Sequence, residues 1–257
     1  MMNYNFHAHT WRCSHATGTE REYIEAAISA GIKEWGFSEH IPFIFPNGKE
    51  NSYRVPLTEV QEYIDTVIAL KEEYKDRINI HLGFEMEYYP EYFDEMVENA
   101  REWGAEYLIL GQHSVGDEPE FFFWSTEATD NTEYLKDYVN RVVEAIKSGV
   151  ITYIAHPDMF NFVGDDKVYD EEMLKIIKEA EEYNVPLEIN FLGIRDNRTY
   201  PTEKFWRLAE GYDISVVFGF DAHDVCGACD LESLPKALEM CEKYNIKVLD
   251  RPKLKKL

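Results

Sequence analysis

The stretch TEYLKDYVNRVVEAIKSGVITYIAHPD, residues 132–158, contains one complete helix-then-strand unit. Apolar residues recur at three- and four-residue spacing over residues 132–147, which predicts an amphipathic helix. Ser148-Gly149 ends this helix, because glycine readily adopts the left-handed conformation found after helix C-termini. The apolar run Thr152–Ala155 then predicts a buried strand, and His156 follows directly. The unit therefore predicts a strand with a histidine at its carboxyl end.

Short apolar runs and amphipathic segments alternate in the same way along the whole chain. The runs that predict strands are Asn3–Ala8, Glu34–Ser38, Ile78–Phe84, Tyr107–Leu110, Thr152–Ala155, Pro186–Asn190 and Ser215–Phe218. The segments that predict helices are Glu20–Ala30, Thr58–Tyr74, Tyr92–Trp103, Thr132–Lys147, Asp170–Tyr183, Thr202–Ala209 and Leu231–Lys243. Strand-then-helix units in succession predict parallel strands joined by right-handed crossovers. At 257 residues, they predict a closed or nearly closed βα barrel.

Local signals add detail to this α/β architecture. Thr58, Thr132 and Thr202 stand where helix N-caps are expected. The stretch Ile41–Pro56 has no clear period and is expected to be an ordered active-site loop. Because no linker rich in Ser, Gly or Pro interrupts the chain, residues 1–257 are expected to form a single domain.

The charge and the cysteine content restrict the partners and the compartment. The chain has 26 Lys and Arg residues against 49 Asp and Glu residues, a formal net charge of −23. This charge disfavours nucleic acid and anionic membranes as partners, but not a small phosphate ester. No apolar run reaches the roughly 20 residues of a membrane span, and the polar N-terminus is unlike a signal peptide, so a cytoplasmic protein is expected. The four cysteines, including Cys226-x-x-Cys229, are too few for a disulfide scaffold, and one CxxC alone is a weak zinc or redox signal.

Histidines and acidic residues gather where the predicted strands end. Six of the eight histidines lie at or just after a carboxyl end, in NFHAH, FSEH, GQH, IAHPD and GFDAHD. In a βα barrel these ends lie on one face, where ligand sites are built. Together with one histidine in the first loop and two acids, they give these candidate metal ligands: His7, His9, His15, His40, Glu85, His113, His156, Asp221 and His223.

Imidazole and carboxylate ligands without thiolate are typical of zinc, manganese or iron. A catalytic metal uses three or four protein ligands, so nine ligands predict two or three divalent ions. His15 and His40 can instead support other ligands, with Glu39 as a partner of either.

Three further residues near the motifs have weaker assignments. Asp158 and Asp224 follow ligand histidines closely and are candidates to orient an imidazole. His81 lies four residues before Glu85, too far along the strand for it to be expected as a ligand.

Hydrolysis is the expected reaction, because paired metals activate water and polarise phosphoryl or carbonyl oxygens. No P-loop, dinucleotide-binding or GxSxG motif competes with this interpretation. Arg195 and Arg198 share the loop after the sixth strand, and arginine binds phosphate oxygens in bidentate fashion, so both are candidate substrate ligands. The catalytic candidates are Asp221, His223, Asp158 and Arg195. Which of His223, Asp158 or metal-bound water protonates the leaving group stays open.

The ordered set HAH…H…EH…E…H…HPD…DAH resembles the PHP (polymerase and histidinol phosphatase) superfamily over nearly the whole chain. The resemblance implies a distorted (β/α)7 barrel with two or three metals at the carboxyl ends of the strands. It also implies three ligand groups: His7, His9, Glu85 and Asp221; then Glu85, His113 and His156; then His15, His40 and His223.

Chain length and the loop after FSEH look most like the stand-alone histidinol-phosphate phosphatase branch. That branch hydrolyses L-histidinol phosphate to L-histidinol and phosphate in histidine biosynthesis. Here the segment after His156-Pro-Asp158 has no Arg or Lys before Lys167, so Arg195 and Arg198 are the expected phosphate anchors. Aromatic residues available to stack on a flat substrate are Tyr88, Tyr89, Phe121, Phe122, Phe123, Trp124, Phe160 and Phe162.

Two alternatives remain besides this leading hypothesis. One is a related phosphatase that acts on another small phosphate ester or a nucleotide. The other is a non-catalytic metal-binding module built on the same barrel. A nuclease is disfavoured because the net charge of −23 leaves no basic track for a strand. The sequence indicates neither the metal's identity nor the oligomeric state.

Overall fold

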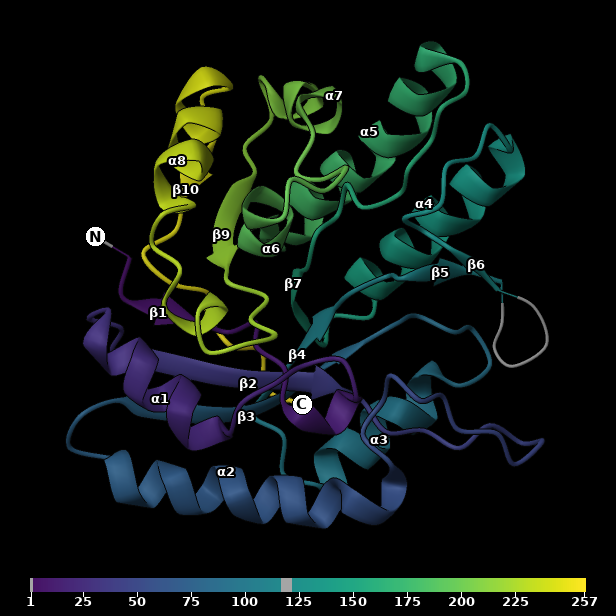
Figure 1. The fold of residues 1–257 in the computed structure, drawn as a ribbon. Coiled ribbons are helices and arrows are strands. Elements are labelled where there is room, and N and C mark those ends of the chain that lie inside the picture. Colours follow the sequence, from purple (N-terminus) through teal and green to yellow (C-terminus); the bar gives the residue numbers. More distant parts are fainter. Residues whose placement is uncertain (1, 117–121) are drawn as a thin grey trace.

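The computed structural model describes residues 2–116 and 122–257. Within these residues, eight parallel strands form one sheet that curls into a half-barrel (Figure 1). In sheet order the strands are β1 (Tyr4–Asn5), β2 (Glu34–His40), β3 (Asn79–Met86), β4 (Tyr107–Leu110), β7 (Ile151–Ile154), β8 (Leu187–Asn190), β9 (Ser215–Gly219) and β10 (Lys247–Val248). The predicted distorted βα barrel is confirmed. The added strand, β10, was not predicted because its two residues are too few to show a period.

The residues that follow β1 and those that follow β9 meet at the carboxyl ends of the strands. Ala8 and Ala222, more than 200 positions apart, form a parallel bridge there. The His9 N–H donates to the Ala222 carbonyl at 3.0 Å, and the Ala222 N–H donates to the His7 carbonyl at 3.3 Å. At the amino end of β9, its first residues pair with β10. The bridge therefore places the histidines after β1 beside the residues that follow β9.

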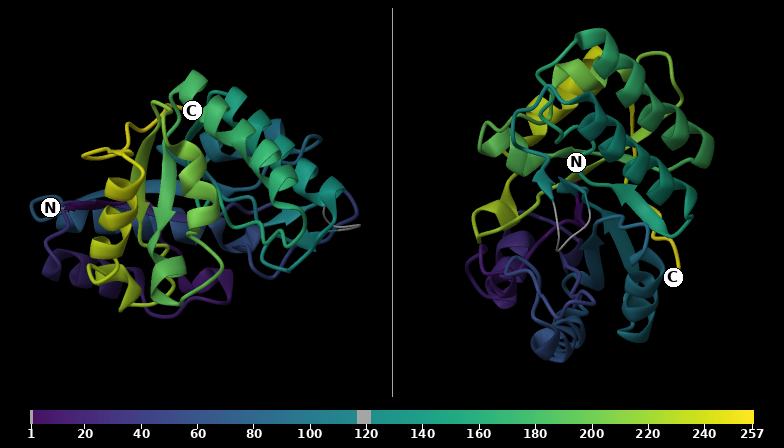
Figure 2. Two further views of the ribbon diagram at one scale, coloured as in Figure 1. Left: turned by 90° about the horizontal axis from the view of Figure 1, so that it is seen from above. Right: turned by 90° about the vertical axis from the view of Figure 1, so that its right-hand side faces the viewer.

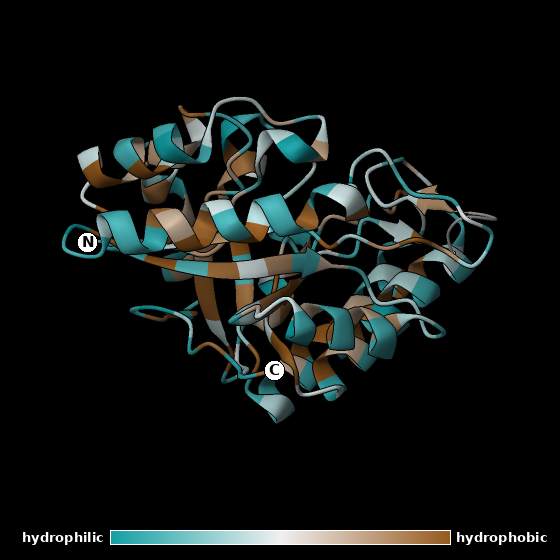
Figure 3. Ribbon diagram, turned by 90° about the horizontal axis from the view of Figure 1, so that it is seen from below, coloured by the Kyte–Doolittle hydropathy of each residue, from teal (hydrophilic) through white to brown (hydrophobic). Residues whose placement is uncertain are grey.

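Helices cover the outside of the sheet, and every segment predicted to be helical contains one. They are α1 (Glu20–Ser29), α2 (Val60–Tyr74), α3 (Phe93–Glu102), α4 (Thr132–Lys147), α5 (Asp166–Tyr183), α7 (Glu203–Trp206) and α8 (Leu234–Lys243). Figure 3 shows mainly hydrophobic strands and helices that carry hydrophilic residues on their outward sides. Burial of the apolar helix faces against the strands forms the core.

The observed N-termini of the helices contradict two of the three predicted N-caps. Thr202 caps α7, since its side chain accepts from the N–H of Lys204. Thr132 is not a cap, because it is the first residue of α4. The N-cap is Asn131, whose side chain accepts from the N–H of Glu133. Thr58 lies inside the 3-10 turn Leu57–Glu59 that precedes α2. Thr and Asn cap helices almost equally well, so neighbouring cap residues are hard to separate by sequence.

Three irregular segments border the carboxyl ends of the strands. The loop Ile41–Pro56 leaves β2, as expected for a loop near the site. A hairpin of β5 (Ser114–Val115) and β6 (Phe123–Trp124) follows β4, and α6 (Phe191–Arg195) follows β8 directly. Neither the hairpin nor α6 was predicted, since both are shorter than a periodic pattern needs. Among the described helices, none is long and apolar enough to cross a membrane.

Candidate metal centre

Glu85, the next-to-last residue of β3, lies at the centre of the predicted ligands and is fully buried. Five imidazoles face its carboxylate. Its Oε1 lies 3.1 Å from Nε2 of His156, 3.4 Å from Nε2 of His7 and 3.5 Å from Nε2 of His113. Its Oε2 lies 3.3 Å from both Nε2 of His9 and Nδ1 of His40. One carboxylate between two groups of imidazoles has the arrangement of a ligand that bridges metals.

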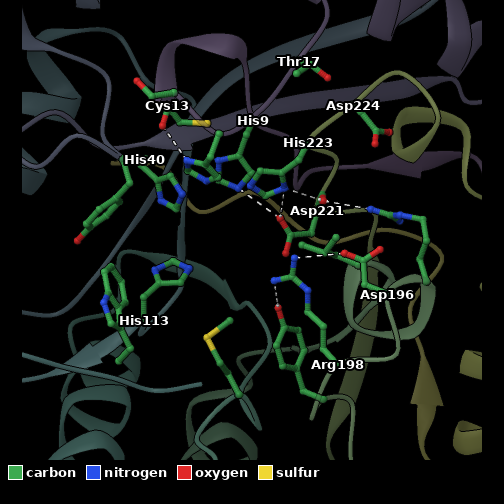
Figure 4. A pocket seen from close by; sticks show the side chains of 18 of the residues that line it. His9, Cys13, Thr17, His40, His113, Asp196, Arg198, Asp221, His223 and Asp224 are labelled. Carbon is green, nitrogen blue, oxygen red and sulfur yellow. Dashed lines mark hydrogen bonds and ion pairs between the residues drawn. The ribbon is translucent and has the colours of Figure 1, made fainter. Parts of the chain in front are cut away.

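Asp221 provides a second carboxylate from the loop after β9. Its Oδ1 lies 3.4 Å from Nε2 of both His7 and His9, and 3.3 Å from Nδ1 of His223. The ring of His15 lies 4.9 Å from that of His223 and 5.4 Å from that of His40, measured between centroids. Figure 4 shows His9, His40 and His223 close together beside Asp221. All nine predicted ligands therefore converge at the carboxyl ends of the strands.

Buried carboxylates hold three of these imidazoles from behind. Nδ1 of His7 donates to Glu188 at 2.8 Å, Nδ1 of His9 to Glu39 at 3.3 Å, and Nδ1 of His113 to Glu87 at 2.8 Å. Such bonds fix the ring orientation and leave the Nε2 lone pair for a metal. The expectation that Glu39 would serve His15 or His40 is wrong, because its carboxylate holds His9.

Backbone carbonyls replace carboxylates behind two other rings. Nδ1 of His15 donates to the Cys13 carbonyl at 2.7 Å, and Nδ1 of His223 lies 3.1 Å from the Asp221 carbonyl. Glu87 and Glu188 were not predicted to contact an imidazole. Each does carry a signal, since Glu85-x-Glu87 and Glu188-x-Asn190 place two polar side chains on one strand face.

Two acids predicted to orient imidazoles do something else. Oδ2 of Asp158 accepts from the N–H of Thr202 at 2.6 Å, and Oδ1 of Asp224 accepts from the N–H of Gly227 at 2.6 Å. Both predictions are corrected: these side chains fix loop backbone, because Asp158 accepts from Thr202, the N-cap of α7, and Asp224 accepts from its own turn. His81 has both ring nitrogens hydrogen-bonded outside the cluster, to Glu106 and Asn79.

The backbone around the cluster is adapted to its side chains. A Cβ atom at Gly111 would overlap the Glu85 carboxylate, and one at Gly219 would overlap that of Glu188. Two ligand positions, His156 at φ 32° and Asp221 at φ 46°, adopt positive φ angles that cost free energy for residues with a Cβ. The backbone is therefore locally strained at these two positions, where the side chains are directed into the cluster.

The donor set fits divalent cations. Nε2 of His7, Nδ1 of His40, Oε2 of Glu85 and Oδ1 of Asp221 are buried without a hydrogen-bond partner among the described residues. Unsatisfied buried donors and acceptors are rare and costly unless an ion or water completes them. Burial disfavours the charged form of His7, but Asp221, Glu188 and Glu85 outweigh burial and hold its pKa well above the ordinary value. Surplus negative charge thus surrounds the imidazoles, as a cation site requires.

Comparison with known proteins agrees with this geometry. A family model described as the PHP domain matches residues 5–191. The chain belongs to the PHP domain family. A "probable histidinol-phosphatase" of Deinococcus radiodurans is 33% identical over an alignment of 228 positions, which covers 84% of this chain and 85% of the relative. The histidinol-phosphatase of Bacillus subtilis is 25% identical over 253 residues, covering 84% of this chain and 92% of the relative.

The fold of this PHP domain also matches solved structures. The histidinol phosphate phosphatase of Lactococcus lactis, crystallised with zinc, L-histidinol and phosphate, superposes with a TM-score of 0.71. The match covers 98% of each chain at 20% sequence identity, so it supports the fold alone.

A cleft of about 760 Å³ opens over the metal centre of the PHP domain. His40, His113, His223 and Asp221 line its floor, and Tyr53 and Trp124 line one wall with ring centroids 5.4 Å apart. A volume of this size suits a small molecule. Of the aromatic residues available to stack on a flat substrate, Trp124 lines the cleft, Tyr89, Phe160 and Phe162 are buried in the core, and Phe121 lies outside the described residues.

The two predicted arginines line the same cleft but make different contacts. Arg195, at the end of α6, donates to Asp230 at 2.7 Å and to the Phe220 carbonyl at 3.4 Å. Arg198 donates to the Tyr200 hydroxyl and to Asp196, both at 3.3 Å, and its side chain is 42% exposed. In Figure 4 its guanidinium reaches toward Asp221.

Proposed function

We propose that this PHP domain is a metal-dependent phosphomonoesterase that hydrolyses L-histidinol phosphate to L-histidinol and phosphate in the cytoplasm. The observation that carries the proposal is the convergence of nine ligand side chains, with unsatisfied buried atoms, under a cleft that contains an exposed arginine. The names of the relatives support the same substrate. The matched model ends at residue 191, but β9 and β10 complete the same sheet, so we propose that residues 1–257 form one domain.

Three groups of side chains are proposed to hold two or three divalent ions. The first is His7, His9, Glu85 and Asp221; the second is Glu85, His113 and His156; the third is His15, His40 and His223. Ligand atoms of His7, His9 and Glu85 lie within 4.8 Å of one another, as do those of His9, His40 and His223. When bound, such ions polarise the phosphoryl group and activate water.

Arg198 is the proposed phosphate anchor. Its guanidinium is held by Tyr200 and Asp196 but stays exposed to the cleft, so it can present two N–H groups to phosphate oxygens. We propose a positioning role for Arg195, whose Nη2 also lies 3.5 Å from the Asp221 carbonyl. Its guanidinium therefore holds the loop that carries Asp221 rather than the substrate.

The proton for the leaving alcohol is proposed to come from the His223 side of the cleft. Asp158 is buried, bonds the Thr202 backbone and is not among the described residues that line the cleft. Burial raises the pKa of Asp158 to about 7, so it can stay protonated, but its place behind the cleft gives it a supporting role. His223 lines the cleft, but burial lowers the pKa of its imidazole to about 3, so the ring is neutral and we propose that water on this side of the cleft supplies the proton.

The test is phosphate release by the zinc- or manganese-loaded protein. L-Histidinol phosphate is expected to be the best of a panel that includes sugar phosphates and nucleoside monophosphates. A chelator should abolish turnover, and added metal should restore it. Arg198→Ala should raise KM by about tenfold or more, since charge-assisted hydrogen bonds to phosphate are lost. Arg207→Ala is a matched control, because Arg207 pairs with Asp170 on the surface.

Each other outcome selects a different function. Preference for another ester would identify a related phosphatase with a different substrate. Bound metal without hydrolysis of any ester would indicate a non-catalytic module. Unchanged turnover in Glu85→Gln would refute the proposed centre, because that carboxylate faces five imidazoles.

A further inference from the structure

A second cavity, of about 790 Å³, lies at the end of the barrel opposite to the metal centre. Residues at or before the amino ends of strands line it: Gly149 and Thr152 at β7, Pro186 before β8, and Asp213 and Ser215 at β9. The C-terminal segment 247–256 forms the remaining wall. In the left view of Figure 2, the chain's C-terminus lies at the far end of the barrel from the loop that follows β9. We call this cavity the basal pocket.

The lining of the basal pocket is strongly basic. Its cationic residues are Lys247, Arg251, Lys253, Lys255 and Lys256, and its only acidic lining residue among those described is Asp213. Five of the 26 Lys and Arg residues thus gather around one cavity in a chain with 49 acidic residues. On a surface with this excess of acidic residues, a Lys or Arg side chain would normally lie next to carboxylates. The local charge therefore has the opposite sign to that of the molecule.

The lysines of the basal pocket are not neutralised by the protein. Arg251 pairs with Glu34 at 2.6 Å. Among the described residues, the four lysines form no ion pair, whereas several surface lysines elsewhere do, such as Lys136 with Glu133 and Lys147 with Glu144. The positive charge at the pocket is therefore available to a ligand.

Lys255 is held in place at a cost. Its backbone N–H donates to the Thr152 hydroxyl at 3.2 Å, Pro252 is buried, and Leu254 and Leu257 pack against the core. The side chain is half-buried, and burial lowers the pKa of its ammonium group. A partly desolvated cation without a counter-charge is destabilising, and a bound anion would remove that cost.

We propose that the basal pocket is a second ligand site, which binds a small organic polyanion carrying two or more phosphate, sulfonate or carboxylate groups. Its volume lies within the range of small-molecule sites. The net charge of −23 repels an extended polyanion, so a compact one is selected. Tyr183 and Leu249 add an apolar part to the lining, which suits the carbon skeleton between the charged groups. The pocket requires no metal, and its proposed role is independent of phosphatase activity.

The test uses propane-1,3-disulfonate, a dianion that is neither hydrolysed nor a strong chelator, titrated calorimetrically into the metal-loaded protein at low salt. Lys253→Gln/Lys255→Gln should weaken binding about tenfold or more, because two charge-assisted contacts are lost. Lys136→Gln/Lys147→Gln removes the same charge from α4 and should leave the affinity unchanged. Arg198→Ala should also leave it unchanged, since that residue lies in the cleft over the metals.

Three results would overturn the proposal. Equal weakening in both lysine double variants would show a general charge effect without a site. Loss of binding in Arg198→Ala alone would place the dianion in the cleft. Self-association that disappears in Lys253→Gln/Lys255→Gln, measured by sedimentation, would show that acids of a second copy occupy the pocket. Thermal unfolding of each variant checks the fold, and Lys247→Gln/Lys256→Gln repeats the test if the first pair is unstable.

Discussion

Replacing Arg54 with methionine should destabilise the protein severely, although Arg54 lies in a loop. Its Nη2 donates to Glu87 at 2.6 Å, and its Nη1 donates to the Ile41 carbonyl at 3.1 Å. The side chains of Arg54 and Glu87 are 1% and 0% exposed. The other oxygen of Glu87 accepts from Nδ1 of His113. This buried chain of contacts connects the loop Ile41–Pro56 to a predicted metal ligand.

The expected magnitude follows from burial. Methionine leaves Glu87 buried without its guanidinium, and removing one partner of a buried ion pair costs about 3–5 kcal/mol. Burial alone raises the pKa of Glu87, but Arg54 and His113 outweigh it and hold that pKa below its ordinary value. Without Arg54, Glu87 should therefore take up a proton and become a poorer acceptor for His113.

Urea unfolding of the metal-free protein measures the effect. Arg54→Met should lose about 3–5 kcal/mol of unfolding free energy. Arg77→Met is the matched control, because Arg77 and its partner Glu25 are about half exposed, and it should lose under about 1 kcal/mol. Arg54→Met/Glu87→Gln should recover part of the loss, since no unpaired buried carboxylate remains. A loss below about 1 kcal/mol in Arg54→Met, or strict additivity in the double variant, would refute this reasoning.

Further predictions test single contacts of the site and one salt bridge outside it. Glu188→Gln should lower metal affinity about 10- to 100-fold in a chelator competition, because Glu188 holds the His7 ring. Gly111→Ala should reduce metal content and lose about 1–3 kcal/mol of stability, because its Cβ overlaps the Glu85 carboxylate; full metal content would contradict the proposed close packing. Burial raises the pKa of Glu106, but His81 and Lys71 outweigh it and lower that pKa to about 2 from an ordinary 4.5. The stability that Glu106 contributes is therefore present above pH 4.5 and lost as the pH falls toward 2, so Glu106→Gln should reduce acid sensitivity in that window.

The sequence was sufficient to predict that the candidate ligands converge, because their positions depend on local signals. Each strand end is marked by an apolar run and a following polar residue, and the barrel gathers those ends at one face. His7 and Asp221 could therefore be placed together without knowing any contact between them. The fold was predictable for the same reason, apart from β10, the β5–β6 hairpin and α6, which are too short to show a period.

The supporting residues depend on contacts that the pattern does not contain. Glu87 and Glu188 act through the orientation of rings on neighbouring strands, which depends on register and side-chain rotamers. The different contacts of Arg195 and Arg198 depend on α6, a five-residue helix that points Arg195 at Asp230 and leaves Arg198 in the cleft. Charged residues in a loop can be found by sequence, but their partners are fixed by tertiary packing.

The charge of the buried site leads to an expectation for how many ions it holds. Its buried carboxylates are Glu39, Glu85, Glu87, Glu188 and Asp221, and Arg54 is the buried cation that pairs with one of them. Five negative charges and one positive charge leave −4, which two divalent ions would neutralise. A third ion would give the centre +2, which matches a phosphate monoester dianion.

Metal stoichiometry should therefore be coupled to anion affinity. We expect the protein with two ions per chain to bind inorganic phosphate weakly, and the protein with three ions to bind it much more tightly. Metal analysis combined with phosphate titration at each loading measures this, and His15→Ala should prevent the tighter state, because that exposed ring belongs only to the third group. Equal phosphate affinity at both loadings would show that Arg198, rather than the charge of the metal centre, determines anion binding.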